Sequence, residues 1–232
     1  MSARAKAVDD LEQTLGYRFR DRDLLERALT HASVGEGAKK IRDNECLEFL
    51  GDRVLGLLVS ETLMRRFPEA KEGELSQRFH ALVNREACAS AARQIGLGSA
   101  LRMAAGETKS GGRENNTILG DAIEALIAAV YLDSNSFDQV KSTFGPIWAK
   151  ILAETGDGRL LNPKSFLQEW AAARAKPVPL YEILARSGPD HAPVFSVSVT
   201  VDGLNPASGT GRSRQDAEKS AAVALLKREN LI

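Results

Sequence analysis

Acidic side chains recur at helical spacing in two separate segments of this 232-residue sequence. In the first segment, Glu48 and Asp52 follow Glu45 after three and seven residues, which places the three carboxylates in one column of a helix. The column borders an apolar face, and no Lys or Arg stands four residues after any of the three. In the second segment, Asp121 and Glu124 are three residues apart in a stretch that is otherwise almost wholly apolar or small. Burial of a lone ionised carboxylate costs several kcal/mol, so these acids need a cation or a basic partner.

Two interpretations fit the acids. Taken singly, each could be solvated on a helix face or form a buried salt bridge with Arg or Lys from elsewhere in the chain. Taken together, two helices that each offer carboxylates on one face favour a site for a hard cation, because Mg²⁺ and Mn²⁺ prefer oxygen ligands. No His stands among the acids, which argues against zinc. Such a site activates water for attack on a phosphodiester.

The elements that must position these acids are helical over the first two thirds of the chain. Apolar periodicity and Gly, Pro and Asn breaks predict helices over residues 11–15, 23–29, 44–66, 74–95, 117–132 and 137–152. Residues 106–116 are predicted to form a Gly-rich loop, and no strand pattern of any length is visible. We therefore expect an all-α domain over residues 1–154.

The rest of the chain has a different pattern. Residues 155–160 are predicted to form a linker, because they contain two glycines. Apolar residues alternate with Ser and Thr over 195–201, which is typical of a half-buried strand. With helices predicted at 164–174 and 214–229 and further strands at 181–186 and 207–210, the order is α-β-β-β-α. We expect a small α+β domain over 161–232, with both helices on one face of an antiparallel sheet.

Composition excludes several classes of protein. The chain is 43% hydrophobic and 27% charged with zero net charge, which is typical of a soluble, core-forming protein. Cys46 and Cys88 stand alone, which argues against a disulfide framework and a zinc knuckle. Apolar runs such as 54–59 are too short to span a bilayer, and the first ten residues carry two Asp and no apolar segment. We therefore expect a cytoplasmic protein without a membrane partner. Residues 161–232 carry nine Lys and Arg against seven Asp and Glu, an asymmetry too small to indicate a polyanion partner by itself.

Several motifs together resemble the signature of the bacterial ribonuclease III family. They are ALTHAS (28–33), NECLEFLGDRVL (44–55), EGELS (72–76), KSGG (109–112) and GDAIEAL (120–126). The resemblance implies that Asp52 and Glu124 are catalytic, that Glu48, Asp121 and Glu124 are metal ligands, and that Glu45 and Glu72 are accessory acids. Cys46 stands where the family usually has Arg. Because this position points away from the acidic column, we expect an effect on packing or dimer contacts.

The α-β-β-β-α segment resembles the double-stranded RNA-binding domain. Helix starts bind phosphate through free N–H groups, and Arg212, Arg214 and Lys219 add positive charge at this one. Without the resemblance, a capped and solvated helix start explains these residues equally well. The resemblance implies that the helix start crosses the major groove, and that Gln168, Glu169 and His191 contact minor grooves. Gln215 replaces a residue that is often basic in the family, which predicts modest affinity.

Four further residues could be structural or functional. His31 is expected to make a structural hydrogen bond at a helix end, and Cys88 to be a small core residue. Lys109 and Arg113 could contact phosphate or belong to a solvated loop.

The resemblance implies a Mg²⁺-dependent endonuclease, with Mn²⁺ able to substitute, that cuts double-stranded RNA and leaves 5′-phosphate and 3′-hydroxyl ends. It further implies a homodimer, no small-molecule cofactor, and processing of rRNA, tRNA and mRNA precursors. One alternative is a non-catalytic RNA-binding protein of the same fold; such proteins typically lose the acids, which are all present here. A second alternative, a helical hydrolase acting on a small nucleotide, is disfavoured by the RNA-binding module.

Overall fold

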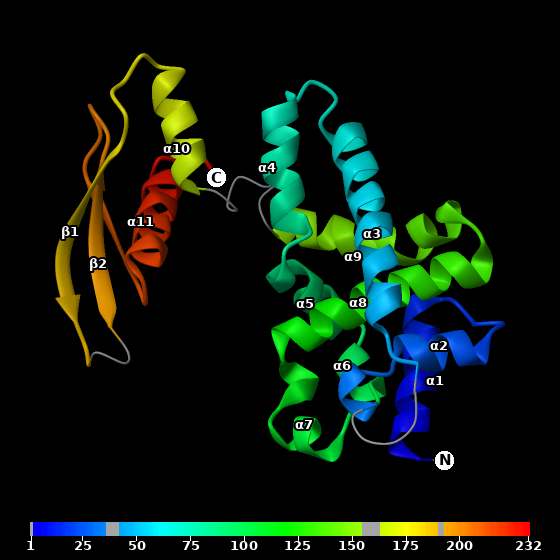
Figure 1. The fold of residues 1–232 in the computed structure, drawn as a ribbon. Coiled ribbons are helices and arrows are strands. Elements are labelled where there is room, and N and C mark those ends of the chain that lie inside the picture. Colours follow the sequence, from blue (N-terminus) through cyan, green and yellow to red (C-terminus); the bar gives the residue numbers. More distant parts are fainter. Residues whose placement is uncertain (1, 36–41, 155–162, 190–192) are drawn as a thin grey trace. The chain divides into compact units, whose positions relative to one another are not determined.

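The computed structural model describes residues 2–35, 42–154, 163–189 and 193–232, which form two compact units (Figure 1). The first unit spans Met1–Glu154 and the second spans Thr155–Ile232. The predicted linker at 155–160 lies outside the described residues. No helix in the described ranges is long and apolar enough to cross a membrane.

The first unit is helical, as predicted. Its elements are α1 (Ala3–Leu15), α2 (Arg22–Ala28), α3 (Glu45–Arg66), α4 (Glu72–Leu82), α5 (Arg85–Gln94), α6 (Leu97–Ala100), α7 (Ala105–Lys109), α8 (Asn116–Ser134) and α9 (Phe137–Glu154), with 3₁₀ turns η1 (Ala32–Val34) and η2 (Gly112–Glu114). Within its described residues, the only β pairing is an isolated bridge between Thr30 and Arg102.

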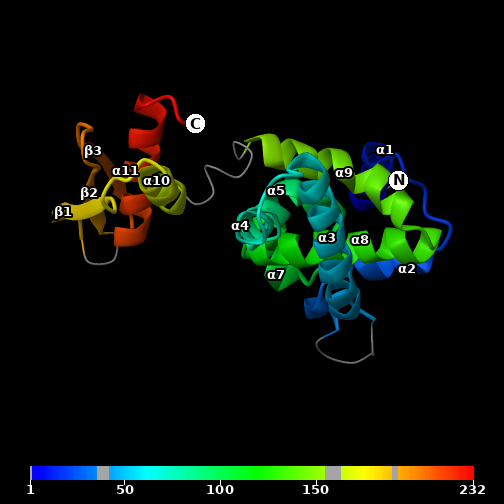
Figure 2. The same cartoon turned by 90° about the horizontal axis from the view of Figure 1, so that it is seen from above.

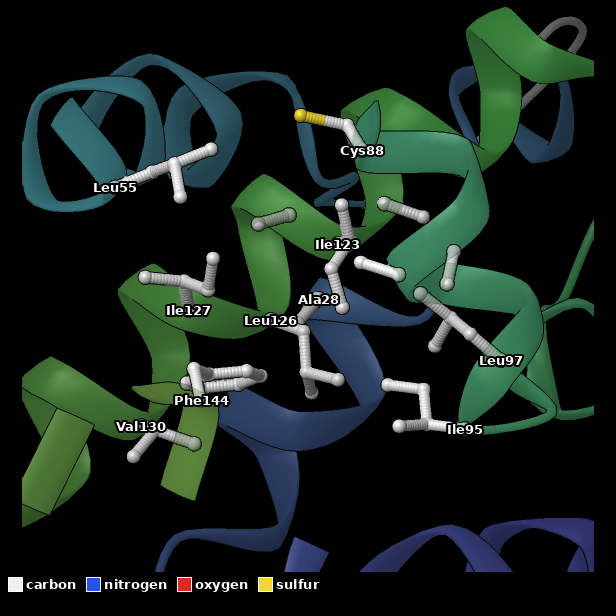
Figure 3. Packing of buried hydrophobic residues seen from close by; sticks show 14 of the residues in the cluster. Ala28, Leu55, Cys88, Ile95, Leu97, Ile123, Leu126, Ile127, Val130 and Phe144 are labelled. Atoms are coloured by element: carbon white, nitrogen blue, oxygen red, sulfur yellow. The ribbon is translucent and has the colours of Figure 1, made fainter. Parts of the chain in front are cut away.

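Helix α8 forms the centre of this unit. The side chain of Asn115 caps its start by accepting the N–H groups of Thr117 and Ile118, and Asn135 ends it in the left-handed region. Most of its residues are buried, and Figure 3 shows Ile123, Leu126, Ile127 and Val130 inside a cluster that includes residues of α2, α3, α5 and α9. A helix that is apolar nearly all round must be enclosed by other elements, which is how α8 is placed.

The helix predicted over 74–95 is two helices, so that prediction was wrong. The break falls at Val83 and Asn84, where the Asn84 side chain accepts the backbone N–H of Ala87 at 2.9 Å and caps α5. The carbonyl of Leu82, freed at the end of α4, accepts the indole N–H of Trp148 at 3.0 Å. Local capping and a tertiary hydrogen bond therefore override a continuous helical pattern.

Two other predictions differ from the structure. The first helix begins at Ala3 rather than Leu11, because Ser2 caps a polar first turn that lacks apolar periodicity. The loop predicted at 106–116 contains α7 and η2. Arg113 fixes this segment by donating to the carbonyls of Gly98 at 2.5 Å and Leu101 at 3.1 Å, so Arg113 has a structural role.

The second unit has the predicted α-β-β-β-α order. It comprises α10 (Pro163–Ala172), β1 (Leu180–Ser187), β2 (Val194–Thr200), β3 (Ala207–Gly211) and α11 (Arg214–Arg228). The sheet is antiparallel in the order β1-β2-β3, and both helices lie on one side of it (Figures 1 and 2). Helix α11 packs closely on β3: a Cβ on Gly209 would lie 2.1 Å from the backbone nitrogen of Ala221. Nearer the start of α11, a Cβ on Gly211 would lie 2.5 Å from the backbone nitrogen of Ala217, so the first turn of the helix is fixed on the sheet as well.

Candidate active site

The predicted carboxylates meet where α3 crosses α8. A Cβ on Gly51 of α3 would lie 1.8 Å from the backbone carbonyl oxygen of Glu124, so the two helices touch backbone to backbone at this point. Glu48 stands three residues before Gly51 and Asp52 directly follows it, while Asp121 lies one turn before Glu124. The crossing therefore gathers carboxylates from both helices on one side of the core.

The charges of these carboxylates act on one another. Burial raises the pKa of Glu124 to about 7, and the negative charges of Asp52 and Glu48 add to the rise. Burial also raises the pKa of Glu48, helped by the charges of Asp121, Glu45 and Asp52. Mutual repulsion of this kind indicates one electrostatic cluster.

Asp121 differs from Glu48 and Glu124 because positive groups lower its pKa. Burial raises the pKa of Asp121, but Arg85 and, to a smaller extent, His31 act in the opposite direction. Arg85 begins α5, and its Cγ would lie 3.8 Å from a Cβ placed on Gly120, the neighbour of Asp121. A guanidinium thus borders the acidic cluster.

The predicted ligands suit a hard cation, since each of them offers carboxylate oxygen and the acids of the cluster raise one another's pKa. Across the described ranges, however, no three His, Cys, Asp or Glu side chains already form a group able to hold a metal ion. Asp52 accepts instead from the guanidinium of Arg53 at 3.3 Å. The residues fit a cation by chemistry, and their side chains would have to turn inward to ligate it.

Glu124 also has a sulfur neighbour. The Cys88 thiol lies 3.7 Å from Glu124 Oε1 and can donate to it, and Cys88 is buried on α5 (Figure 3). Burial and the Glu124 charge raise the pKa of this thiol, so it keeps its proton. Cys88 is a core residue, as predicted, and it also contacts the predicted catalytic acid.

The accessory acids are placed differently from each other. Glu45 is exposed in the first turn of α3, and its charge reaches Glu48. Glu72 is exposed at the start of α4 and lines a groove of about 380 Å³ beside Ser60 and Met64. Ser60 stands eight residues beyond Asp52 on α3, about 12 Å along the axis. Within one chain, Glu72 is therefore not brought together with the four central carboxylates.

Two further residues that the sequence analysis singled out are His31 and Cys46. His31 Nδ1 accepts the backbone N–H of Ser33 at 3.3 Å and caps η1, which confirms its predicted hydrogen bond at a helix end. Cys46 is exposed.

The predicted RNA-contacting residues of the second unit lie on α10 and at the start of α11. Ser213 caps α11 by accepting the N–H of Asp216 at 3.1 Å. The predicted contact residues that the structure describes are all exposed; they are Gln168, Glu169, Arg212, Arg214 and Lys219. His191 lies outside the described residues.

Comparison with protein-family models gives two matches that together span most of the chain. A model described as Ribonuclease-III-like matches residues 21–149, more than half of the sequence. The chain belongs to the ribonuclease III family. A model described as double-stranded RNA binding motif matches residues 163–228, within the second compact unit.

Relatives in the ribonuclease III family cover nearly the whole chain. A Ribonuclease 3 of Caulobacter vibrioides is 57% identical over 229 residues, 99% of each chain. A Ribonuclease 3 of Phenylobacterium zucineum is 53% identical over 230 residues, covering 99% of this chain and 96% of the relative. Among solved structures, the ribonuclease III nuclease domain of Campylobacter jejuni matches with a TM-score of 0.57 and 42% identity, covering 62% of this chain and 96% of the other. The predicted family and fold class are confirmed.

Sequence reasoning missed residues that act through contacts between elements. Gly51 lies inside one of the family motifs, but only the crossing of α3 and α8 shows that a glycine there lets the two backbones touch. Lys164 and Glu218 carry no local signal, yet both carboxylate oxygens of Glu218 are engaged, one by Lys164 Nζ and the other by Arg214 Nε at 2.8 Å.

Proposed function

We propose that this ribonuclease III family member is an endoribonuclease that hydrolyses phosphodiester bonds of double-stranded RNA at the α3–α8 carboxylates, leaving 5′-phosphate and 3′-hydroxyl ends. The backbone contact of Gly51 with Glu124 carries the proposal, because it gathers acids whose pKa values are raised first by burial and then by mutual repulsion. A cluster of this kind attracts a divalent cation, and a bound cation would reduce the repulsion between the carboxylates.

Each acid has a proposed role. Glu48, Asp121 and Glu124 would hold Mg²⁺, for which Mn²⁺ can substitute, and Asp52 and Glu124 would act directly in hydrolysis. When bound, the cation supplies an activated water and stabilises charge on the phosphate. The chain fixes Glu124 between the backbone of Gly51 and the thiol of Cys88, while the more exposed Asp52 is free to exchange Arg53 for water. Glu45 and Glu72 remain proposed accessory acids.

The proposed partners are duplex RNA and a second copy of the chain. The match to the double-stranded RNA binding motif supports the first. Large apolar side chains on α3 support the second: Phe49 is 65%, Leu57 56% and Met64 64% exposed. For the Campylobacter jejuni protein, a region involved in dimer formation has been described. We further propose that the protein is cytoplasmic and processes rRNA, tRNA and mRNA precursors. It would need no small-molecule cofactor.

A non-catalytic RNA-binding protein of this fold is the alternative. Such a protein has no need of four carboxylates that repel one another, and family membership with curated Ribonuclease 3 relatives favours the enzyme. Cys46, in place of the usual Arg, is exposed, and we expect its effect on packing or dimer contacts.

The deciding experiment incubates labelled duplex RNA with the protein in EDTA, in Mg²⁺ and in Mn²⁺. We expect binding in all three conditions and cleavage with either cation only. Binding without cleavage in every condition would support the non-catalytic alternative. Cleavage in EDTA would contradict the metal-dependent mechanism.

A further inference from the structure

The starts of α10 and α11 are joined by one buried carboxylate. Glu218 lies one turn into α11 with its side chain only 9% exposed, and its two oxygens have different partners. Oε1 accepts from Arg214 Nε at 2.8 Å within α11, whereas Oε2 accepts from Lys164 Nζ in the first turn of α10. The two cations lower the pKa of Glu218, so the carboxylate is charged at neutral pH. A buried charge shared in this way fixes both partners in space.

Lys164 is held from a second side. Its Nζ lies 5.0 Å from the ring centroid of Tyr181 on β1, a cation–π distance. Lys164 therefore meets α11 through Glu218 and the sheet through Tyr181, while its side chain stays 34% exposed. An ammonium has three donors, and Glu218 accepts only one of them.

Arg214 also keeps free donors. Only Nε binds Glu218, and the side chain is 63% exposed. In the part of the chain that the structure describes, its two terminal nitrogens have no hydrogen-bond partner, so they are available to a phosphate.

We propose that Glu218 is a positioning residue that sets the spacing between the RNA-contacting starts of α10 and α11, and that Lys164 is a phosphate-binding residue of this surface. The proposal rests on duplex-RNA binding by the second unit. Double-stranded RNA is recognised by A-form shape across successive grooves, so a surface on two helices needs their starts at a fixed separation. Glu218 fixes that separation.

An alternative role for Glu218 predicts the opposite change in RNA binding. If the carboxylate merely neutralised two cations, its removal would free them and strengthen binding to any polyanion. The two explanations predict opposite signs for Glu218→Gln, which removes the charge and keeps the shape.

The experiment compares full-length wild type, E218Q and K164Q on duplex RNA and duplex DNA of the same sequence, in EDTA. Glu229→Gln is the matched control, because Glu229 pairs with Arg228 at the other end of α11. We expect E218Q and K164Q to weaken RNA binding about tenfold, the effect of one charged hydrogen bond, and DNA binding much less, so that RNA preference falls. E229Q should match wild type. In Mg²⁺, KM for duplex RNA should rise by a similar factor with kcat nearly unchanged.

Three results would overturn the proposal: tighter RNA binding by E218Q, equal losses on RNA and DNA, or a fall in kcat at unchanged KM. If E218Q does not fold by thermal melting, K164Q decides alone, because it leaves the Glu218–Arg214 pair intact. A wild type without preference for duplex RNA would instead contradict the proposed function, which keeps the two failures distinct.

Discussion

At the scale of single residues, Glu124 is the acid whose surroundings change its chemistry most. Its pKa of about 7 comes first from burial and then from neighbouring acids, so without a cation it is partly protonated at neutral pH. Asp52 is more exposed and has Arg53 beside it. Two carboxylates that look alike in sequence thus have different surroundings.

Glu124→Ala should lower cleavage by roughly a thousandfold or more while duplex-RNA binding stays near wild type. A metal ligand stabilises the transition state, whereas ground-state binding comes from phosphate contacts elsewhere. Filter binding and single-turnover cleavage on one duplex measure both quantities, with Glu86→Ala, an exposed acid on α5, as control. Near-normal cleavage by E124A would make this acid structural and place the metal elsewhere.

The same residue predicts how stability depends on pH. Its folded pKa of about 7 exceeds the ordinary 4.5, so between these values the folded state binds more protons than the unfolded state. The contribution of Glu124 to the stability of the metal-free protein should therefore be largest below about pH 4.5 and should fall as the pH rises to about 7. Burial raises the pKa of Glu48 and Asp121 as well, which adds to the decline. Melting temperatures in EDTA at pH 5 and pH 7 should differ less for Glu124→Gln; an unchanged difference would contradict this assignment.

At the scale of elements, the α3–α8 crossing is the feature on which the site depends. A glycine is required because the carbonyl of Glu124 occupies the space that a side chain on Gly51 would fill. Elements with a local signature could be predicted from sequence: α3 and α8 from apolar periodicity, and β2 from the alternation at 195–201. The contacts of Gly51 and Glu218 depend on residues distant in the sequence, which periodicity does not report. The break at Asn84 combines a local cap with the distant hydrogen bond of Trp148, and apolar periodicity reports neither.

Gly51→Ala should separate the helices, destabilise the protein by roughly 3 kcal/mol and abolish cleavage. Gly56→Ala, five residues further on the same helix, is the matched control, because its new Cβ would meet only the Phe79 ring at 3.5 Å. That variant should be stabilised by roughly 0.5–1 kcal/mol through helix propensity and remain active. Urea unfolding and a cleavage assay on both variants test the difference. Equal behaviour of the two would show that the crossing is looser than described.

At the scale of the whole molecule, the proposed catalytic residues and the proposed RNA contacts belong to two units with separate hydrophobic cores. One core surrounds α8, and the other lies between the sheet and its two helices. Each unit matches its own family model, so the division seen along the sequence reappears in the fold.

Removal of residues 155–232 should leave a folded helical unit that cleaves duplex RNA at low salt. At physiological salt its binding should be weaker than that of the whole chain by roughly two orders of magnitude, because each lost phosphate contact weakens binding in a salt-dependent way. Circular dichroism checks the fold, and cleavage at 20 mM and 150 mM salt checks the activity. Equal RNA affinity of both proteins at both salt levels would contradict the division of labour.

One of the two cysteines is exposed and the other is buried, so the unmodified chain can carry a fluorescent label at a single position. Cys46 is exposed in the first turn of α3, two residues before Glu48, whereas Cys88 is buried with its proton retained. A maleimide dye should therefore attach at one position only. Carboxylates that turn inward around a cation would change the surroundings of that dye, so its emission could follow Mg²⁺ titration directly, without RNA and without any engineered label site.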